Sequence, residues 1–183
     1  MLKQLVFTAA LLASFSLGAD SHWAIKDGTG SATVKDSGSS KLDGTIVNPH
    51  RCTWAREDDR GFFLTFDRGG YVKVPHSDKL NFKKGFVAEV FFSCDLAKIG
   101  KTNFACIISK GNNYDRGYSI MVKKDGTLLV TLHGLKMHWY GLVPQANIKS
   151  NRDTRLKVMY DTQNVRIFVD GKSVASYPVA GTL

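Results

Sequence analysis

Two Asp-Gly pairs, each between two runs of β-forming residues, constrain the fold of this chain more than any other feature. Asp125-Gly126 separates "GYSIMV" from "TLLVTLHG", and Asp170-Gly171 separates "VRIFV" from "SVASYPV". Asp-Gly is a preferred pair for the tight turn of a hairpin, because glycine accepts a positive φ at little cost. The two stretches therefore predict two antiparallel hairpins.

The runs between turns also alternate as half-buried strands do. In "RLKVMYD", Leu156, Val158 and Tyr160 fall on one face and Arg155 and Lys157 on the other. Helical patterns are nearly absent, and 183 residues suffice for one domain with a core. Many short strands at regular spacing predict an all-β, two-sheet antiparallel jelly-roll sandwich.

Several of these runs follow one another in an order that resembles LamG-like domains. They are "DRGGYVKVP", "LNFKKGFVAEVFF" and "YDTQNVRIFVDGK", within a stretch from Trp23 to Val174. The resemblance places residues 20–183 among the concanavalin A-like lectin/glucanase jelly rolls, which are often secreted and bind glycans or proteins. Such domains end on a strand of the G-x-I-D-E-V-x-I-Y type, and this sequence has none. A fragment lacking its last strand and a shortened variant both explain the difference.

The N-terminus has the three-part layout of a secretory signal peptide. Lys3 supplies a positive charge, an apolar run follows from Leu5 to Leu17, and small residues come next, with cleavage expected after Gly18 or Ala19. The apolar run is shorter than the ~20 residues that cross a bilayer, although an uncleaved anchor is the alternative. We therefore expect residues 1–19 to be a signal peptide and the mature protein to be extracellular or periplasmic, without a membrane span.

Export makes the three cysteines candidates for a disulfide. Cys94 ends "FVAEVFFSC" and Cys106 lies in "FACIIS". If these runs pair as a hairpin around Gly100, both cysteines point inward and lie opposite each other. A Cys94–Cys106 disulfide and two reduced core cysteines are both compatible with this pattern. Cys52 is left over, and no spacing of Cys and His indicates zinc.

The residues that catalyse glycan hydrolysis on this fold are missing from the sequence. Glucanase relatives carry an E-x-D-x-x-E run on one strand, whereas this chain has only two glutamates, Glu57 and Glu89, and no such run. A glycoside hydrolase relative is the less favoured reading, and we expect a protein that is not an enzyme. The net charge of +9 favours anionic ligands, but no nucleic-acid-binding motif appears, so nucleic acid is not an expected partner.

Two segments supply candidate ligand-binding residues. The first, "LHGLKMHWYGLVP", carries His133, His138, Trp139 and Tyr140, which combine aromatic rings with hydrogen-bonding groups. Trp139 and Tyr140 are neighbours, so on a strand one of them must point inward. The second segment is the polar loop "KGNNYDRGYS", in which Tyr114 and Arg116 are the candidates. Packing in the sandwich and a solvated loop are the plain alternatives.

No cofactor or metal ligand set is evident from the sequence. Asp36 in "KDSGSS" matches a family position found beside structural calcium, but the sequence shows no oxygen partners for it. The reading that combines these points is a secreted jelly-roll module that binds a glycan. The alternative is an adhesion domain that recognises a protein at a cell surface.

Overall fold

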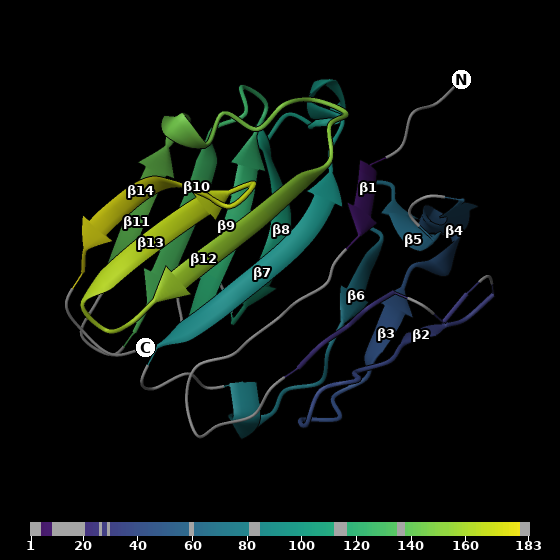
Figure 1. Ribbon diagram of the computed structural model, residues 1–183. Coiled ribbons are helices and arrows are strands. Elements are labelled where there is room, and N and C mark those ends of the chain that lie inside the picture. Colours follow the sequence, from purple (N-terminus) through teal and green to yellow (C-terminus); the bar gives the residue numbers. More distant parts are fainter. Residues whose placement is uncertain are drawn as a thin grey trace.

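The computed structural model is an all-β molecule of antiparallel strands, which confirms the predicted fold class (Figure 1). The structure describes residues 5–8, 21–25, 27–28, 30–58, 61–80, 85–111, 117–134 and 138–179, and for residues 5–8 and 138 it describes the backbone. Within these residues, four single turns of 3-10 helix connect strands: η1 (Pro49–Arg51), η2 (Asp78–Leu80), η3 (Leu96–Lys98) and η4 (Pro144–Ala146).

The strands fall into three sheets. The first half of the chain supplies β1 (Leu5–Thr8), β2 (Thr33–Val34), β3 (Gly44–Val47), β4 (Cys52–Glu57), β5 (Gly61–Phe66), β6 (Tyr71–Lys73) and β7 (Phe86–Ser93). The second half supplies β8 (Phe104–Lys110), β9 (Gly117–Lys123), β10 (Leu128–His133), β11 (His138–Val143), β12 (Thr154–Tyr160), β13 (Asn164–Val169) and β14 (Lys172–Pro178). The strand orders are β14-β13-β12-β7-β1-β5-β4, β11-β10-β9-β8 and β2-β3-β6.

The sandwich is formed where the seven-stranded and four-stranded sheets face each other. In Figure 1, β7, β12, β13 and β14 lie in front of β8, β9, β10 and β11. The core between them takes alternate residues from both layers, such as Leu156 and Val158 from β12 and Val130 and Leu132 from β10, all fully buried. The alternation read from the sequence of β12 is therefore confirmed. Burial of apolar side chains at about 25 cal/mol per Å² is the main force that holds the two sheets together.

Both Asp-Gly pairs form the expected hairpin turns. β9 pairs with β10 around Asp125-Gly126, and β13 pairs with β14 around Asp170-Gly171. Asp170 (φ 51) and Gly171 (φ 79) are both left-handed, which is the pattern of a primed hairpin turn. At Gly126, a Cβ atom would lie 2.4 Å from the carbonyl oxygen of Ile148, so a larger residue cannot fit there without movement of the backbone.

The hairpin predicted around Gly100 is wrong, and the disulfide that depended on it does not form. β7 pairs with β12 and β1 in the seven-stranded sheet, whereas β8 pairs with β9 in the four-stranded sheet. Cys94 is buried in the core, and Cys106 is exposed on the opposite sheet; both are free thiols, as is Cys52. Regular alternation predicts that Cys106 points inward together with Ile108, but a β-bulge lies between these two residues. The extra residue of the bulge reverses the alternation along the strand and turns Cys106 outward.

The N-terminal strand β1 lies in the middle of the seven-stranded sheet. It pairs antiparallel with β5 on one side and with β7 on the other, so that it joins these two strands. β1 belongs to the segment that the sequence predicts to be a cleaved signal peptide. Cleavage after residue 19 would therefore remove a central strand and leave the β5 and β7 edges without this neighbour.

Candidate functional site

The outer face of the four-stranded sheet, which points away from the core, brings together part of the sequence-predicted site. On β10, Val130 and Leu132 point into the core, so Thr131 and His133 point outward. On the neighbouring edge strand β11, Tyr140 lies directly opposite Thr131 and is 73% exposed. His133 and Tyr140 therefore share one face, as a common binding site would require.

Four hydroxyl side chains form a single row on this side of the sheet, exposed at its two ends (Ser109 and Tyr140), partly buried at Thr131 and buried at Ser119, which is 6% exposed. Ser109 on β8 pairs with Ser119 on β9, Ser119 pairs with Thr131 on β10, and Thr131 pairs with Tyr140 on β11. Directly paired residues of antiparallel strands project on the same side of a sheet. The hydroxyl oxygens of Ser119 and Thr131 lie 2.6 Å apart and share a hydrogen bond. Three inter-strand steps of about 4.8 Å give this hydroxyl row a length of ~14 Å.

The rows on either side of the hydroxyl row differ in chemistry. On one side, His133 pairs with Gly117 on β9 and with His138 on β11. On the other side, an apolar row consists of Met121, Leu129 and Leu142, the last of which is 52% exposed. The outer face thus carries three adjacent rows: one with the imidazole of His133, one of hydroxyl side chains and one of apolar side chains. Hydroxyl groups can both donate and accept hydrogen bonds.

Trp139 takes no part in this face. It pairs with the core residue Leu132 and packs against the main core, and its ring lies 5.6 Å from that of Tyr177. Gly141, the next residue on the same side of β11, has no side chain to displace the ring: a Cβ atom there would be 2.7 Å from it. The inward residue of the Trp139–Tyr140 pair is therefore Trp139, and the exposed aromatic ring is that of Tyr140.

The remaining predicted site residues lie outside what the structure describes. Tyr114 and Arg116 belong to the segment between Gly111 and Gly117, outside the described residues, and the side chain of His138 is likewise outside them. Gly111 and Gly117, which flank residues 112–116, adjoin β8 and β9, and these strands carry Ser109 and Ser119 of the hydroxyl row. Sequence reasoning missed Ser109, Ser119 and Thr131, because isolated hydroxyls carry no motif and form a row only once the strand register is known.

Comparison with known families agrees with this architecture. A family model described as "Concanavalin A-like lectin/glucanases superfamily", named Laminin_G_3, matches residues 66–183, from the end of β5 onward. The chain belongs to this superfamily. The match covers all strands of the four-stranded sheet, and with them the whole hydroxyl row. No curated protein matches the chain.

Asp36 accepts hydrogen bonds from the backbone. From the sequence, this residue matches a family position found beside structural calcium. Its carboxylate accepts from the backbone N–H groups of His22, Gly38 and Leu42 at 2.7–2.9 Å. Burial opposes ionisation of Asp36, but these donors outweigh it and hold the pKa of the carboxyl below its usual value. Within the described parts of the chain, no group of three or more His, Cys, Asp or Glu is arranged to hold a metal ion.

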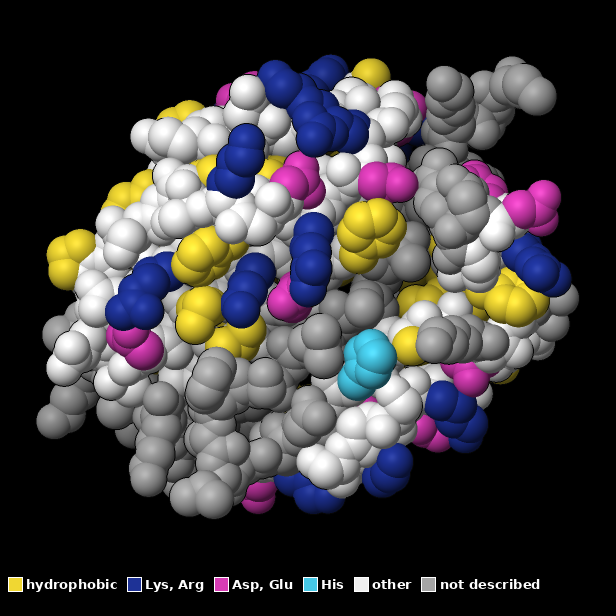
Figure 2. Space-filling view, viewed as in Figure 1, with side chains coloured by type: hydrophobic (Ala, Val, Ile, Leu, Met, Phe, Trp, Pro, Cys, Tyr) yellow, Lys and Arg dark blue, Asp and Glu magenta, His cyan; other side chains and the backbone are white. Residues whose placement is uncertain are grey.

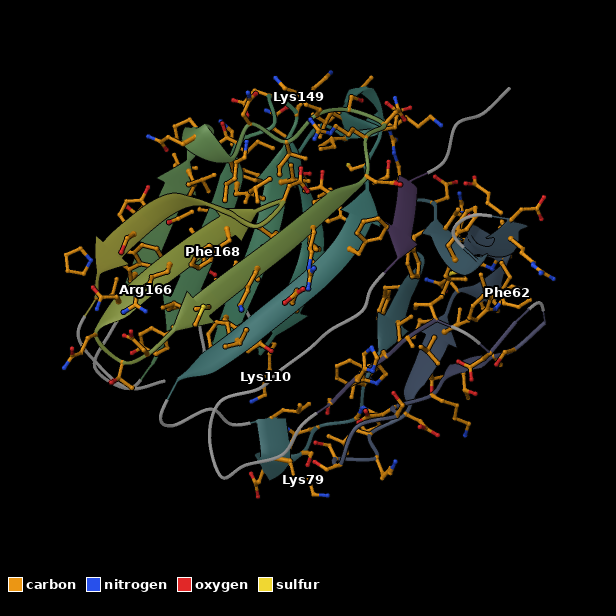
Figure 3. The ribbon with its side chains drawn as sticks, in the orientation of Figure 1. Phe62, Lys79, Lys110, Lys149, Arg166 and Phe168 are labelled. Carbon is orange, nitrogen blue, oxygen red and sulfur yellow. The ribbon has the colours of Figure 1, made fainter. Side chains whose placement is uncertain are left out.

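Glu89 lies on the other broad surface of the superfamily fold, the outer face of the seven-stranded sheet. It is buried and forms an ion pair with Arg155 on the adjacent strand. Figure 2 shows this side of the molecule, where Lys and Arg side chains lie among hydrophobic ones over β7, β12 and β13. Arg166 and Phe168 project from β13 on this face (Figure 3). Across the described residues, no helix has the length and hydrophobicity that crossing a membrane requires.

Proposed function

We propose that this chain is an exported, non-catalytic module that binds a glycan on the outer face of the four-stranded sheet. The observation that carries the proposal is the hydroxyl row, which ends at the exposed ring of Tyr140 and adjoins His133. A sugar offers hydroxyls for the accessible members of this row, Ser109 and Thr131, and an apolar ring face for Tyr140. Sites for such ligands combine an aromatic wall with a few polar groups. The net charge of +9 favours acidic sugars.

The positions of the two glutamates support the absence of glycosidase activity. Glu57 is on β4, at the end of the seven-stranded sheet, and Glu89 is on β7, three strands away. Three inter-strand steps amount to ~14 Å. Retaining glycosidases need carboxyl groups about 5–5.5 Å apart, and inverting ones about 6.5–9.5 Å. We therefore expect no turnover of β-glucans by the purified protein.

A glycan array probed with the protein at low and high salt tests the proposal. Tyr140→Ala should lower binding of the best glycan, because it removes the exposed ring at the end of the hydroxyl row. Tyr71→Ala is the matched control, since Tyr71 is also exposed (49%) but lies on β6 in another sheet. Equal binding by the Tyr140→Ala variant and the unmodified protein would contradict the proposed site. Loss of binding only in the Tyr71→Ala variant would instead indicate that the glycan binds at the three-stranded sheet, which contains β6.

One observation favours the second candidate function, recognition of a protein at a cell surface. Tyr140 and Leu142 are both large and exposed, and they lie two residues apart on the same side of edge strand β11. Exposed apolar side chains that gather on one surface are typical of protein contacts. Leu142→Asp distinguishes the two functions: it should abolish binding to a protein partner and leave glycan binding by the hydroxyl row within twofold of that of the unmodified protein.

A further inference from the structure

A second feature, which meets the hydroxyl row only at Ser109, is a cleft between the edges of two sheets. β6 is the last strand of the three-stranded sheet and β8 is the last strand of the four-stranded sheet, among the strands described. All residues of both strands line one cleft of about 1550 Å³. Pockets for small ligands are usually ~300–1,000 Å³, so this cleft has room for a longer chain.

The two strands present the same kind of surface to the cleft. An edge strand carries backbone N–H and C=O groups that no neighbouring strand satisfies, and these groups pair readily with another extended chain. Neither β6 nor β8 has a described strand partner on the side away from its own sheet. An extended segment in the cleft can therefore pair with one of these edges.

The charge of the cleft is strongly one-sided. Among the described residues, its lining contains one carboxylate, that of Asp67, and the following basic residues: Arg51, Arg68, Lys73, Lys98, Lys101, Lys110 and His76. Asp67 is already paired with Arg51 at 3.1 Å. Lys98 lies 3.8 Å from Asp95 and His76 lies 3.9 Å from Asp78, neither of which lines the cleft. Arg68, Lys73 and Lys101 supply further positive charge along the cleft, which an occupant with negative charge would balance.

The basic residues lie at both ends of β8. Lys98 and Lys101 precede the strand, and the Arg68 guanidinium reaches the carbonyl oxygen of Lys98 across the cleft at 3.5 Å. Lys110 ends the strand and projects toward η2 (Figure 3). Burial lowers the pKa of Lys110, which the nearby Asp78 partly opposes. Six residue steps from Phe104 to Lys110 at ~3.4 Å separate the two basic ends by about 20 Å.

We propose that the cleft binds an extended acidic segment of a partner protein, which adds as a strand to the edge of β8. Main-chain hydrogen bonds to this edge supply affinity that does not depend on sequence, and the basic ends select acidic side chains. A polyanionic glycan in the same cleft is the competing outcome.

The probe is a fluorescent peptide of alternating glutamate and valine, as long as β8, added to the full chain and followed by anisotropy. It should bind, whereas a lysine–valine peptide should not. Two further versions of the peptide carry N-methyl groups, one on the backbone nitrogens of its glutamates and the other on those of its valines. Each version lacks the N–H donors along one of the two edges of the extended peptide. At least one version should bind tenfold more weakly. No binding of the acidic peptide, or full binding of both methylated versions, overturns the proposal.

Charge-reversal variants locate the site. The double variant Lys73→Glu/Lys101→Glu should lose at least tenfold in affinity for the acidic peptide, whereas the matched control Lys149→Glu/Lys172→Glu, also at exposed positions outside the cleft lining, should not. Equal losses in the two double variants overturn the proposal. The proposal is also overturned if a sulfated oligosaccharide binds more tightly than the peptide and if its binding is lost in the Lys73→Glu/Lys101→Glu variant. Tyr140→Ala should leave peptide binding unchanged, which separates this test from that of the glycan site.

Discussion

Two adjacent residues on β11 should respond to truncation in opposite ways. Trp139 packs against the core and the Tyr177 ring, whereas Tyr140 is 73% exposed. Deleting a core aromatic side chain costs about 3–5 kcal/mol, and Trp139 is only partly buried on an edge strand, so we expect Trp139→Ala to lower the free energy of unfolding by about 2–3 kcal/mol. Surface substitutions usually change stability by less than about 0.5 kcal/mol, which is our expectation for Tyr140→Ala.

The effect on binding should be reversed. Loss of the exposed Tyr140 ring should weaken glycan binding by about 1–3 kcal/mol, by analogy with the stacking of nucleic-acid bases on aromatic side chains. Trp139→Ala should keep its affinity at temperatures where it remains folded, because its ring does not reach the outer face. A domain with a margin of ~5–15 kcal/mol tolerates the expected loss.

Urea denaturation followed by tryptophan fluorescence or circular dichroism gives the free energy of unfolding, and titration with the best array glycan gives the affinity. Both variants and the unmodified protein are measured in the same buffer. Unchanged stability of Trp139→Ala together with a loss of affinity would overturn this assignment, since it would mean that Trp139 contacts the ligand and that the inward and outward faces of β11 are reversed.

Other consequences can be measured with the same protein. Folding lowers the pKa of Asp36, so the stabilisation from its carboxylate is present above the unfolded-state pKa of ~3.9 and is lost as the pH falls through the folded-state pKa. In a plot of the urea midpoint against pH, Asp36→Asn should therefore remove the decrease at acidic pH. The same substitution should lower the free energy of unfolding by about 1–3 kcal/mol at pH 7. Gly126→Ala should destabilise by at least ~1 kcal/mol, because its φ is 83° and its Cβ would meet Ile148; an unchanged melting temperature would contradict this. Deletion of residues 1–19 should lower the melting temperature and increase self-association by sedimentation, because it removes β1; a stable monomer would show that β1 is dispensable, as cleavage of the expected signal peptide requires. A thiol reagent should label Cys106 in the folded protein and Cys94 only after unfolding; mass spectrometry that finds a Cys94–Cys106 disulfide would contradict the structure.

The parts of the fold that could be predicted from sequence are those set by local interactions. The β9–β10 and β13–β14 hairpins follow from short turns that contain Asp-Gly, of three residues and two residues respectively, and the buried face of β12 follows from its alternation. The pairing of β7 with β12 is not local, because more than fifty residues separate the strands. The sequence therefore suggested the nearer β8 as the partner of β7, which is the pairing that a Cys94–Cys106 disulfide would have required.

The candidate site shows the same division. Alternation requires that Trp139 and Tyr140 face opposite ways, but only the packing of Trp139 over Gly141 decides which of them points inward. The hydroxyl row depends on the register of four strands, and a shift of one residue in any of them would turn its hydroxyl into the core. The bulge at Ile107 in β8 has this effect on Cys106, which a regular strand would have pointed inward.

Chemical-shift mapping can locate a bound glycan on the sandwich. The isotope-labelled protein is titrated with the best array glycan, and perturbed amide resonances are assigned to strands. We expect the largest perturbations on residues of the outer face of the four-stranded sheet, with Ser119, Thr131, His133 and Tyr140 among them. Perturbations that gather instead around Tyr71 and Lys101 in the cleft, or around Phe168 on the opposite face of the sandwich, would contradict glycan binding by the hydroxyl row.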